Sequence, residues 1–329
     1  MSQRLWIKYQ QYAYDMDVLS DALAAMRTGR PHSSRAQMRA PWRLYSEPFA
    51  GAGFHVVVQG SCRLTPPDDA PIALSVGDLV FFPHGCGHWM TDDLSTPQTD
   101  IPTASLPEPR PEHDDESSLD SDVRIDGSGA STVLMCGAYL MDRSRSHPLL
   151  SDLPEVIHLP ARLGRHPSVR SAIDLLGTEL EQPRPGADAV LPALLDMLLL
   201  FILRAWYEEQ SGHDTATGWA TALADPGITA ALHSIHHTPD RQWTVEELGE
   251  QAGLSRAAFA RRFATLLGRP PLTYLTWWRM TLAARHLRDS DAPIAVVAER
   301  IGYTSEFAFA KAFKREYGTA PGKYRRQCR

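Results

Sequence analysis

Cysteine is scarce in this sequence of 329 residues, and the few cysteines are not grouped. Four are scattered along the chain without any Cys-x-x-Cys pair: Cys62, Cys86, Cys136 and Cys328. This distribution is untypical of a secreted disulfide framework and favours the reducing cytosol. The first residues, MSQRLWIKYQQYAYDMD, hold no apolar segment and no small-residue cleavage site, which predicts that no signal peptide is present. We therefore expect a cytoplasmic protein.

Uninterrupted hydrophobic runs are also missing. The most apolar stretch, Leu194–Trp206, is interrupted by Asp196 and Arg204 and is shorter than the roughly 20 residues that a membrane span needs. It predicts a buried helix and no membrane partner. The sequence has no His-Glu-x-x-His, no phosphate-binding glycine loop and no pattern typical of a Ser–His–Asp triad. We expect a protein that is not an enzyme and that requires no cofactor.

Net positive charge is lacking too, yet the total conceals a strong asymmetry. The formal net charge is −6, from 33 Lys and Arg against 39 Asp and Glu. Residues 241–329 carry 16 basic and 8 acidic side chains, whereas the remaining 240 residues carry 17 basic and 31 acidic ones. Such a difference is typical of a chain in which one domain binds nucleic acid and another does not. The charge pattern therefore predicts a nucleic-acid partner for the C-terminal segment.

An internal repeat organises this basic segment. In each copy a serine suits the N-cap of a helix, two phenylalanines form its buried stripe, and glycine with proline ends it. Each copy is therefore predicted to be a helix–turn–helix unit, and residues 272–288 are predicted to form one long helix between the copies. The landmarks Ser255, Phe259, Phe263, Gly268, Pro271 and Tyr274 recur fifty positions later as Ser305, Phe309, Phe313, Gly318, Pro321 and Tyr324.

The helix that follows each capping serine is predicted to read DNA. Basic and small side chains lie opposite the phenylalanine stripe and would let the helix enter the major groove, where arginine recognises guanine. The helix before it in the first copy is predicted at Thr244–Ala252, opened by a capping box of Thr244 and Glu247. The predicted DNA-binding residues are Arg256, Ala257, Ala260, Arg261 and Arg262 in the first copy, and Glu306, Phe307, Ala310, Lys311 and Lys314 in the second.

The second copy carries a family signature. Residues 294–325, IAVVAERIGYTSEFAFAKAFKREYGTAPGKYR, are close throughout to the pattern of one protein family. The segment 241–329 therefore resembles the C-terminal DNA-binding domain of the AraC family of bacterial transcription regulators. That resemblance implies double-stranded DNA as the partner, contact with RNA polymerase, and an activating role.

The N-terminal portion is predicted to form a small antiparallel barrel or sandwich. Turn residues separate closely spaced short strands, a pattern typical of barrels and sandwiches. Residues 77–88, GDLVFFPHGCGH, match the second cupin motif, and His55 lies on the strand where cupins place ligands. This portion resembles the cupin-type sensor domains that are fused to AraC-type DNA-binding domains. The predicted strands are Trp42–Tyr45, Phe54–Gln59, Cys62–Leu64, Ile72–Leu74, Leu79–Phe82 and Val133–Met141.

Four side chains are candidates for the sensor or ligand site: His55, His88, Cys86 and Cys136. They admit three interpretations, namely buried side chains that fill the barrel, ligands of a metal ion such as zinc or iron, and thiols that respond to oxidation. The third follows from a partial resemblance to regulators that sense reactive chlorine species, in which a cysteine stands in the context of Cys136. The partner cysteine expected nearer the N-terminus in such sensors is absent.

The predicted fold class is α+β, with a cupin-like barrel, a middle helical segment that either dimerises or packs within the monomer core, and an all-α C-terminal domain. The sensor domain is placed at residues 1–160, and it includes a short helix within 15–26 and a disordered, acidic insertion at about 94–131. The helical segment is placed at 161–210, with helices at 168–180 and 187–209. The DNA-binding domain is placed at 218–329, after a linker at 210–217, with a leading helix at 218–236.

These observations predict a sequence-specific transcription regulator, controlled by a signal that its cupin-like domain receives. The effector is a small molecule or an oxidant of unknown identity, and the working form is a homodimer. The competing interpretation is a cupin metalloenzyme, an oxygenase or isomerase, that carries an accessory DNA-binding domain.

Overall fold

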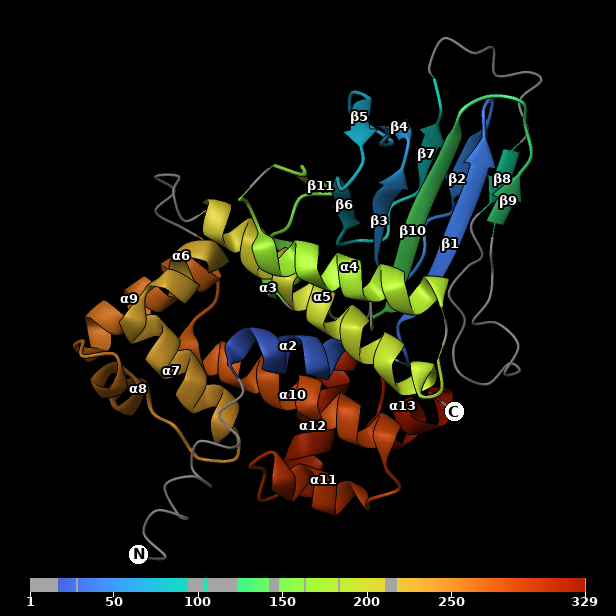
Figure 1. The fold of residues 1–329 in the computed structure, drawn as a ribbon. Helices are drawn as coiled ribbons and strands as arrows, with labels where there is room; N and C mark the ends of the chain where they lie inside the picture. Colours follow the sequence, from blue (N-terminus) through green and yellow to red (C-terminus); the bar gives the residue numbers. More distant parts are fainter. Residues whose placement is uncertain are drawn as a thin grey trace, which may run out of the picture. The chain divides into compact units, whose positions relative to one another are not determined.

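The computed structural model describes residues 17–27, 29–93, 103–105, 123–141, 148–162, 164–182, 184–210 and 218–328. The chain divides into two compact units. The β-rich unit comprises residues 27–146 and 153–209, and the helical unit comprises residues 1–26, 147–152 and 210–329. Strands and two helices make up the first unit, and helices make up the second (Figure 1).

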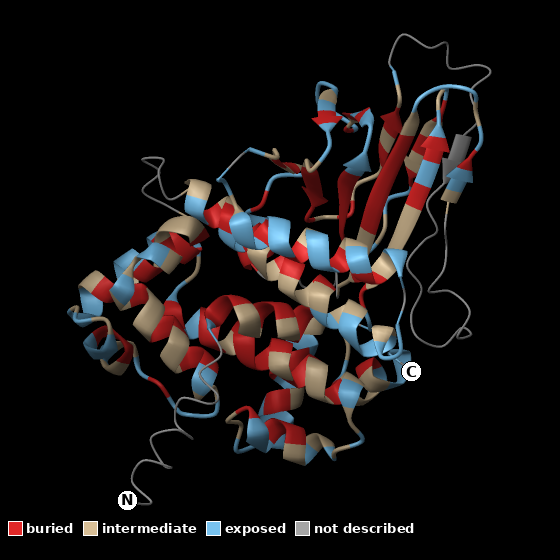
Figure 2. Ribbon diagram, in the orientation of Figure 1, coloured by how far each residue is buried: buried red, intermediate tan, exposed pale blue. Residues whose placement is uncertain are grey.

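The β-rich unit is built from two sheets. One has six strands in the order β11-β6-β3-β10-β1-β9, and the other has five in the order β5-β4-β7-β2-β8. Figure 2 shows that the strands at the centre of the six-stranded sheet are buried over most of their length. The strands are β1 (His32–Arg39), β2 (Arg43–Ser46), β3 (Gly51–Gln59), β4 (Ser61–Thr65), β5 (Ile72–Ser75), β6 (Leu79–Phe82), β7 (His88–Thr91), β8 (Thr103–Ser105), β9 (Val123–Ile125), β10 (Ser131–Leu140) and β11 (Ile157–Leu159).

The interior between the sheets is filled by apolar side chains. Those that are almost completely buried include Trp42, Val57, Phe82, Met90 and Leu134. Burying such side chains stabilises the fold by about 1.5–3 kcal/mol each. All six predicted strands are present within a few residues of their expected bounds. β1 was not predicted, because its first half, HSSR, is polar and only half-buried, and so it lacks the alternation that identifies a strand.

The acidic segment expected to be disordered at 94–131 is in part ordered, so that prediction was wrong for two short stretches. Residues 103–105 form β8, which pairs parallel to β2, and residues 123–125 form β9, which pairs parallel to β1. Backbone hydrogen bonds to a neighbouring strand stabilise these stretches although their composition is polar. The rest of the predicted insertion, 94–102 and 106–122, lies outside the described residues.

Two helices complete the β-rich unit. They are α4 (Pro167–Glu181) and α5 (Ala187–Gln210), close to the two predicted helices. The phenol of Tyr139 on β10 donates a hydrogen bond to the carbonyl oxygen of Leu195 on α5 at 2.6 Å, and Arg27 forms an ion pair with Asp196. By length and by mean hydropathy, 1.9 in its most apolar window, α5 would also suit a membrane span, although one such helix is weak support for a membrane protein.

The helical unit contains ten helices among the described residues. Helix α2 packs against α7 and α10, whereas the sequence had grouped it with the sensor domain at 1–160. The helices are α2 (Val18–Met26), α3 (Pro148–Ser151), α6 (Trp219–Ala224), α7 (Pro226–His237), α8 (Val245–Gln251), α9 (Arg256–Leu267), α10 (Pro271–Asp289), α11 (Ile294–Arg300), α12 (Glu306–Tyr317) and α13 (Pro321–Gln327).

The single leading helix expected at 218–236 is two helices, α6 and α7, so this prediction was wrong. Asp225 lies between them in an extended conformation, with φ −88° and ψ 110°. The following proline disfavours a helical conformation at Asp225 and provides the first residue of α7. The Asp225 carboxylate then caps α7 by accepting hydrogen bonds from the N–H groups of Gly227 and Ile228, at 3.0 and 3.1 Å. The predicted linker residues 211–217 lie outside the described residues.

Candidate DNA-binding surface and sensor site

The first helix–turn–helix unit consists of α8 and α9, and local hydrogen bonds define where each helix begins. The N–H of Thr244 donates to the Glu247 carboxylate at 2.8 Å, and the N–H of Glu247 donates to the Thr244 hydroxyl at 3.1 Å. This capping box was predicted. Gly253 makes the turn with φ +66°, a conformation that glycine adopts without strain. The hydroxyl of Ser255 then accepts a hydrogen bond from the N–H of Ala258 and caps α9.

Helix α9 has one buried and one exposed face. Phe259 and Phe263 are fully buried on the inner face. Because side chains three and four residues apart share a face of a helix, the residues between them point outward. The predicted DNA-binding residues Arg256, Ala257, Arg261 and Arg262 are exposed, and Ala260 is half-buried.

One of these residues, Arg262, has a second role. Its guanidinium forms an ion pair with the carboxylate of Asp225, the residue that caps α7. Burial opposes ionisation of Asp225, but hydrogen bonds from Ile228 and Gly227 and the ion pair with Arg262 hold the pKa of its carboxyl below the usual value. Arg262 therefore connects α9 to α7, whereas no hydrogen bond or ion pair is recorded for Arg256 or Arg261 among the described residues.

The second unit, α11 and α12, repeats this arrangement. The Ser305 hydroxyl accepts a hydrogen bond from the N–H of Ala308, and Phe309 and Phe313 are fully buried. Gly318 ends α12 in the left-handed region with φ +70°, as Gly268 ends α9 with φ +67°. The predicted contact residues Glu306, Phe307, Lys311 and Lys314 are exposed, with Phe307 at 81%, and Ala310 is half-buried.

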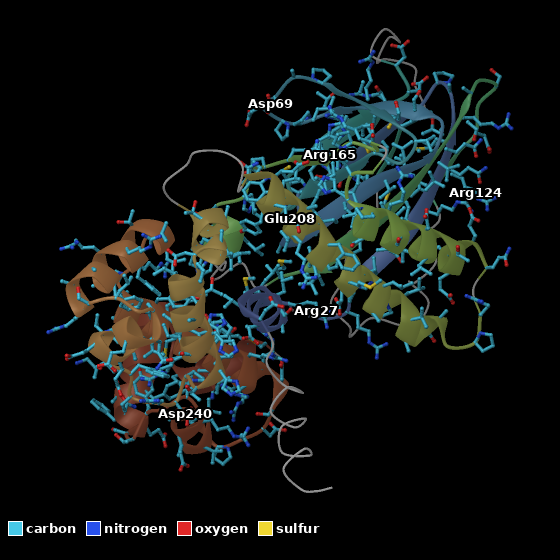
Figure 3. All side chains as sticks on the ribbon, turned by 60° about the vertical axis from the view of Figure 1, so that its left-hand side comes forward. Arg27, Asp69, Arg124, Arg165, Glu208 and Asp240 are labelled. Atoms are coloured by element: carbon cyan, nitrogen blue, oxygen red, sulfur yellow. The ribbon has the colours of Figure 1, made fainter. Side chains whose placement is uncertain are left out.

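The long helix α10 joins the two helix–turn–helix units and buries more than half of its residues. Its Arg279 was not predicted to be a functional residue. It is a buried cation that donates hydrogen bonds to three backbone carbonyls of the α7–α8 loop. The acceptors are the carbonyl oxygens of Pro239 at 2.6 Å, Arg241 at 2.9 Å and Asp240 at 3.5 Å. Asp240 is labelled in Figure 3. These bonds anchor the loop that leads into the first DNA-binding unit. The sequence does not show that this arginine is buried, because a buried charge needs partners, and here the partners are backbone carbonyls of a distant loop.

In the β-rich unit the structure brings His55 and His88 together. Their Nε2 atoms are 2.8 Å apart, and the His88 Nδ1 is 2.9 Å from the carbonyl oxygen of Cys86. The carbonyl can only accept, so Nδ1 of His88 carries the proton, and the Nε2–H of His55 donates to the Nε2 of His88. Phe82 stacks on the His88 ring, with ring centroids 3.9 Å apart.

Burial keeps both imidazoles neutral. It lowers the pKa of His88 to about 4, although the hydrogen bond to the Cys86 carbonyl favours protonation. It lowers the pKa of His55 well below the ordinary value, and the nearby His88 adds to this effect. The Nδ1 of His55 is buried without a hydrogen-bond partner in the described part of the chain.

The histidine pair does not fit a metal ion in this arrangement. Two imidazole nitrogens that ligate one tetrahedral zinc, each about 2.0–2.1 Å from it, are separated by about 3.3 Å and both point at the metal. The Nε2 atoms of His55 and His88 point at each other at 2.8 Å instead. Among the described residues, no group of three or more His, Cys, Asp or Glu side chains is placed to hold a metal ion.

The candidate cysteines are not gathered around the histidines as reactive thiols. Cys136 on β10 is the register partner of His55 on β3, but it is buried, and burial raises the pKa of its thiol to about 12. Cys86 is half-buried, its Sγ lies 3.7 Å from the Glu155 carbonyl oxygen, and burial raises its pKa to about 11. Cys62, which was not a candidate, is close to Cys136 in the same core, and burial raises its pKa to about 12.

Comparisons with known proteins agree with both halves of the chain. The family model described as "Cupin" matches residues 17–208, and that described as "Helix-turn-helix domain" matches residues 248–327. The chain is 31% identical over 312 residues to a putative AraC-like transcription regulator of Streptomyces antibioticus, a match that covers 94% of this chain and 99% of that protein.

Two further similarities concern the whole chain and its C-terminal third. The chain is 29% identical to the RCS-specific HTH-type transcriptional activator RclR of Escherichia coli, over 84% of each protein. The DNA-binding domain of AdpA, solved in complex with a target DNA, is 36% identical over 31% of this chain and 92% of that one, with a TM-score of 0.30. The cupin match alone covers more than half of the chain. The chain therefore belongs to the AraC-like transcription regulators, as a DNA-binding regulator with an N-terminal cupin domain and a C-terminal helix-turn-helix domain.

Proposed function

We propose that α9 and α12 enter adjacent major-groove segments of one DNA duplex and read its sequence. The observation that carries this proposal is the repeated division of each helix into a buried phenylalanine face and an exposed face. Arg256 and Arg261 are free to form the bidentate contacts that distinguish guanine. Lys311 and Lys314 on α12 suit contacts to phosphates, which set the register on the duplex.

Substitution of Arg261 tests the base-reading role. The DNA probe is a duplex that the purified full-length chain selects from a randomised library. Arg261→Ala is expected to weaken binding to this duplex by about tenfold to a hundredfold and to relax preference at one base pair, because a bidentate contact contributes about 1–3 kcal/mol. Arg261→Lys keeps the charge but loses the bidentate geometry. It should therefore largely retain affinity for the duplex while its preference for one base pair is relaxed.

The control for this experiment is Arg63→Gln, which removes an exposed arginine from β4 in the β-rich unit. It should leave both affinity and preference unchanged in a fluorescence-anisotropy titration. If Arg261→Ala bound the selected duplex with unchanged affinity and unchanged base preference, the assignment of this face of α9 would be wrong.

Salt dependence tests the phosphate contacts. The logarithm of the affinity should fall linearly with the logarithm of salt concentration, with a slope set by the number of phosphates contacted. Lys314→Gln should reduce the magnitude of that slope by about one and should weaken binding to all duplexes nearly equally. A change confined to one DNA sequence would instead assign Lys314 to base reading.

We further propose that the bound regulator activates transcription by contacting RNA polymerase in the cytoplasm. The similarity to a protein named as a transcriptional activator supports activation over repression. Transcription in vitro from a promoter with the selected duplex placed upstream should rise when the chain is added. A fall would show a repressor instead.

The proposed working form is a homodimer that pairs through α4 and α5. Leu175 on α4 and Val190 on α5 are 54% and 42% exposed, and only 33% of the most apolar window of α5 is buried. Exposed apolar side chains on neighbouring helices suit a self-complementary interface. Sedimentation equilibrium should show a dimer that Leu175→Glu dissociates, whereas Glu208→Gln, an exposed change at the other end of α5, should leave it intact.

We propose a sensing role, and no catalytic one, for the β-rich unit. The support is that His55 and His88 hydrogen-bond to each other and do not converge on a metal position. The test is metal analysis of the purified chain combined with a measurement of oxygen consumption. Stoichiometric iron together with oxygen consumption would favour the competing metalloenzyme.

A further inference from the structure

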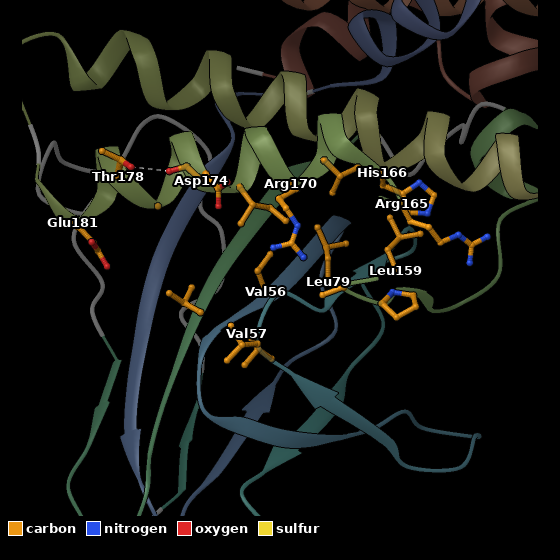
Figure 4. A pocket seen from close by; sticks show the side chains of 18 residues that line it. Val56, Val57, Leu79, Leu159, Arg165, His166, Arg170, Asp174, Thr178 and Glu181 are labelled. Atoms are coloured by element: carbon orange, nitrogen blue, oxygen red, sulfur yellow. Dashed lines mark hydrogen bonds between the residues drawn. The ribbon is translucent and has the colours of Figure 1, made fainter. Parts of the chain in front are cut away.

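A cavity of about 330 Å³ lies in the β-rich unit, separate from the histidine pair (Figure 4). It is bounded on one side by α4 and on the other by β3, the turn before β6, and the residues after β11. Val56, Val58 and Leu79 contribute from the strands. In β3 successive side chains alternate between the two faces of the sheet, so Val56 and Val58 point away from the face that carries His55. This volume lies within the range of small-molecule sites.

The walls of the cavity are largely apolar. Val56, Leu79 and Val169 are buried at 5% exposure or less, whereas Val58 and Val76 are 37% and 56% exposed. A hydrocarbon chain that covered these two valines would remove apolar surface from water, which is favourable. The groove therefore suits a ligand with an apolar body.

One end of the groove carries an exposed cation. Arg170 on α4 lies over Gly77, and in Figure 4 its guanidinium extends from α4 toward the strands. In the described part of the chain, no hydrogen bond or ion pair is recorded for this guanidinium. The other charged groups at this end have partners. Arg165 and His166 contact the Glu209 carboxylate at 3.1 and 3.0 Å. The Asp78 carboxylate, next to Gly77, accepts hydrogen bonds from the N–H groups of Ala161 and Ser75 at 2.7 and 2.9 Å.

The start of α4 adds to the positive potential at this end. His166 occupies the N-cap position, but its side chain makes no capping hydrogen bond. The first N–H groups of a helix without a capping side chain attract an anion, and the helix dipole acts in the same direction. Arg170 and the first turn of α4 therefore both favour a negative group beside Gly77.

Carboxylates farther along α4 limit that ligand to one negative charge. Asp174 and Glu181, farther along α4, also line the groove, and Glu181 contacts Arg35 at 3.4 Å. A ligand with a second anionic group extending toward these carboxylates would be repelled.

We propose that this groove binds a small amphipathic monocarboxylate, with its carboxylate on Arg170 and its apolar chain along Val58, Val76 and Ile173. Guanidinium and carboxylate match in geometry and form a bidentate pair. Binding itself does not depend on the proposed sensing role, and only the effect of binding rests on it. A ligand held between α4 and the sheet would reach the helices through which the chain is proposed to dimerise.

Calorimetry on the full-length chain tests the groove, with octanoate as the probe and 1-octanol as its uncharged counterpart. Octanoate should bind with a stoichiometry of one per chain and more tightly than 1-octanol. Arg170→Gln should weaken octanoate by about tenfold to a hundredfold and leave 1-octanol unchanged, because only the ion pair is lost. Ile173→Glu should abolish the binding of both probes.

Arg63→Gln, an exposed change away from the groove, should bind octanoate like the original chain. The absence of saturable octanoate binding, or equal binding by the chain and its Arg170→Gln variant, would overturn the proposal. Octanoate affinity that falls as chain concentration rises would also overturn it, because a second copy of the chain would then occupy the groove. Affinity for the selected duplex is measured separately without octanoate, so a failure of DNA binding is distinguishable from a failure of this site.

Discussion

The carboxylate of Asp21 lies 3.3 Å from Nδ1 of His236, which connects the N-terminal helix α2 to α7 inside the helical unit. Nε2 of the same imidazole is 2.8 Å from the hydroxyl of Tyr274 on α10, and the ring stacks on Trp278 with centroids 4.0 Å apart. Burial lowers the pKa of His236, although Asp21 opposes this. At neutral pH the ring is therefore neutral, with the Asp21 carboxylate beside its Nδ1 and the Tyr274 hydroxyl within hydrogen-bond distance of its Nε2.

Substitution of Asp21 should loosen the attachment of α2. Asp21→Ala removes the carboxylate beside the buried Nδ1 of His236 and should lower the free energy of unfolding by about 1–3 kcal/mol. Asp21→Asn retains an acceptor oxygen and should cost less. Urea unfolding followed by circular dichroism measures both variants. Equal losses would show that the polar contact between Asp21 and His236 contributes nothing and that only packing of α2 matters.

The buried histidine pair makes stability depend on pH. The pKa of His88 is lowered to about 4 in the folded chain, against about 6.5 when unfolded, and that of His55 is also lowered. Between these values the unfolded chain binds more protons, so the free energy of unfolding falls as the pH falls. His88 alone should account for about 3 kcal/mol between pH 7 and pH 4.

The matched variant for this prediction replaces both histidines with glutamine, which can hydrogen-bond but does not titrate. Urea unfolding at pH 7, 6 and 5 should show a shallower decline for the double variant than for the original chain. Parallel declines would mean that other groups, such as His236, dominate the pH dependence.

Phe307 and Phe309 are neighbours on α12 with opposite environments, at 81% and 0% exposure. Phe309→Ala should destabilise the helical unit by about 3–5 kcal/mol, because it empties a packed site in the core. Phe307→Ala should change stability by less than about 0.5 kcal/mol. It should lower affinity for the selected duplex, since this apolar side chain suits a thymine methyl group. Unchanged DNA binding by Phe307→Ala would remove Phe307 from the DNA-binding surface.

The four thiols should differ in reactivity. Burial raises the pKa of Cys62 and Cys136 to about 12 and that of Cys86 to about 11, so almost no thiolate is present at pH 8. Cys328 is exposed. Iodoacetamide at pH 8 should therefore label Cys328 first and the other three only after unfolding, as read by mass spectrometry of digested chain. Rapid labelling of Cys136 in the folded chain would instead support sensing by thiol oxidation.

The DNA-binding half was largely predictable because its signals are local. The capping residues Thr244, Ser255 and Ser305 make their hydrogen bonds within three or four residues along the chain, and the phenylalanine stripes need only the helical period. The break at Asp225 is also local, but a proline at the first position of a helix and a proline that ends one look alike in a sequence.

The β-rich half was predictable only as a set of strands. β1 escaped detection because its first residues are polar. The pairing of His55 with His88 depends on how β3 and β7 face each other across two sheets, and no spacing along the chain specifies that. The place of Arg170 at the groove could not be recognised either, since the sequence does not reveal which of many arginines borders an apolar groove.

The sequence by itself determined the two helix–turn–helix units, their exposed faces and the strand-rich character of the remainder, because caps, turns and periodic burial act over a few residues. Only the tertiary structure decided that α2 packs with the DNA-binding helices, that two histidines share a hydrogen bond where a metal was one interpretation, and that Arg170 borders an apolar groove. These relationships join residues distant in the chain, and their energies arise from burial and pairing that exist only once the elements have packed together.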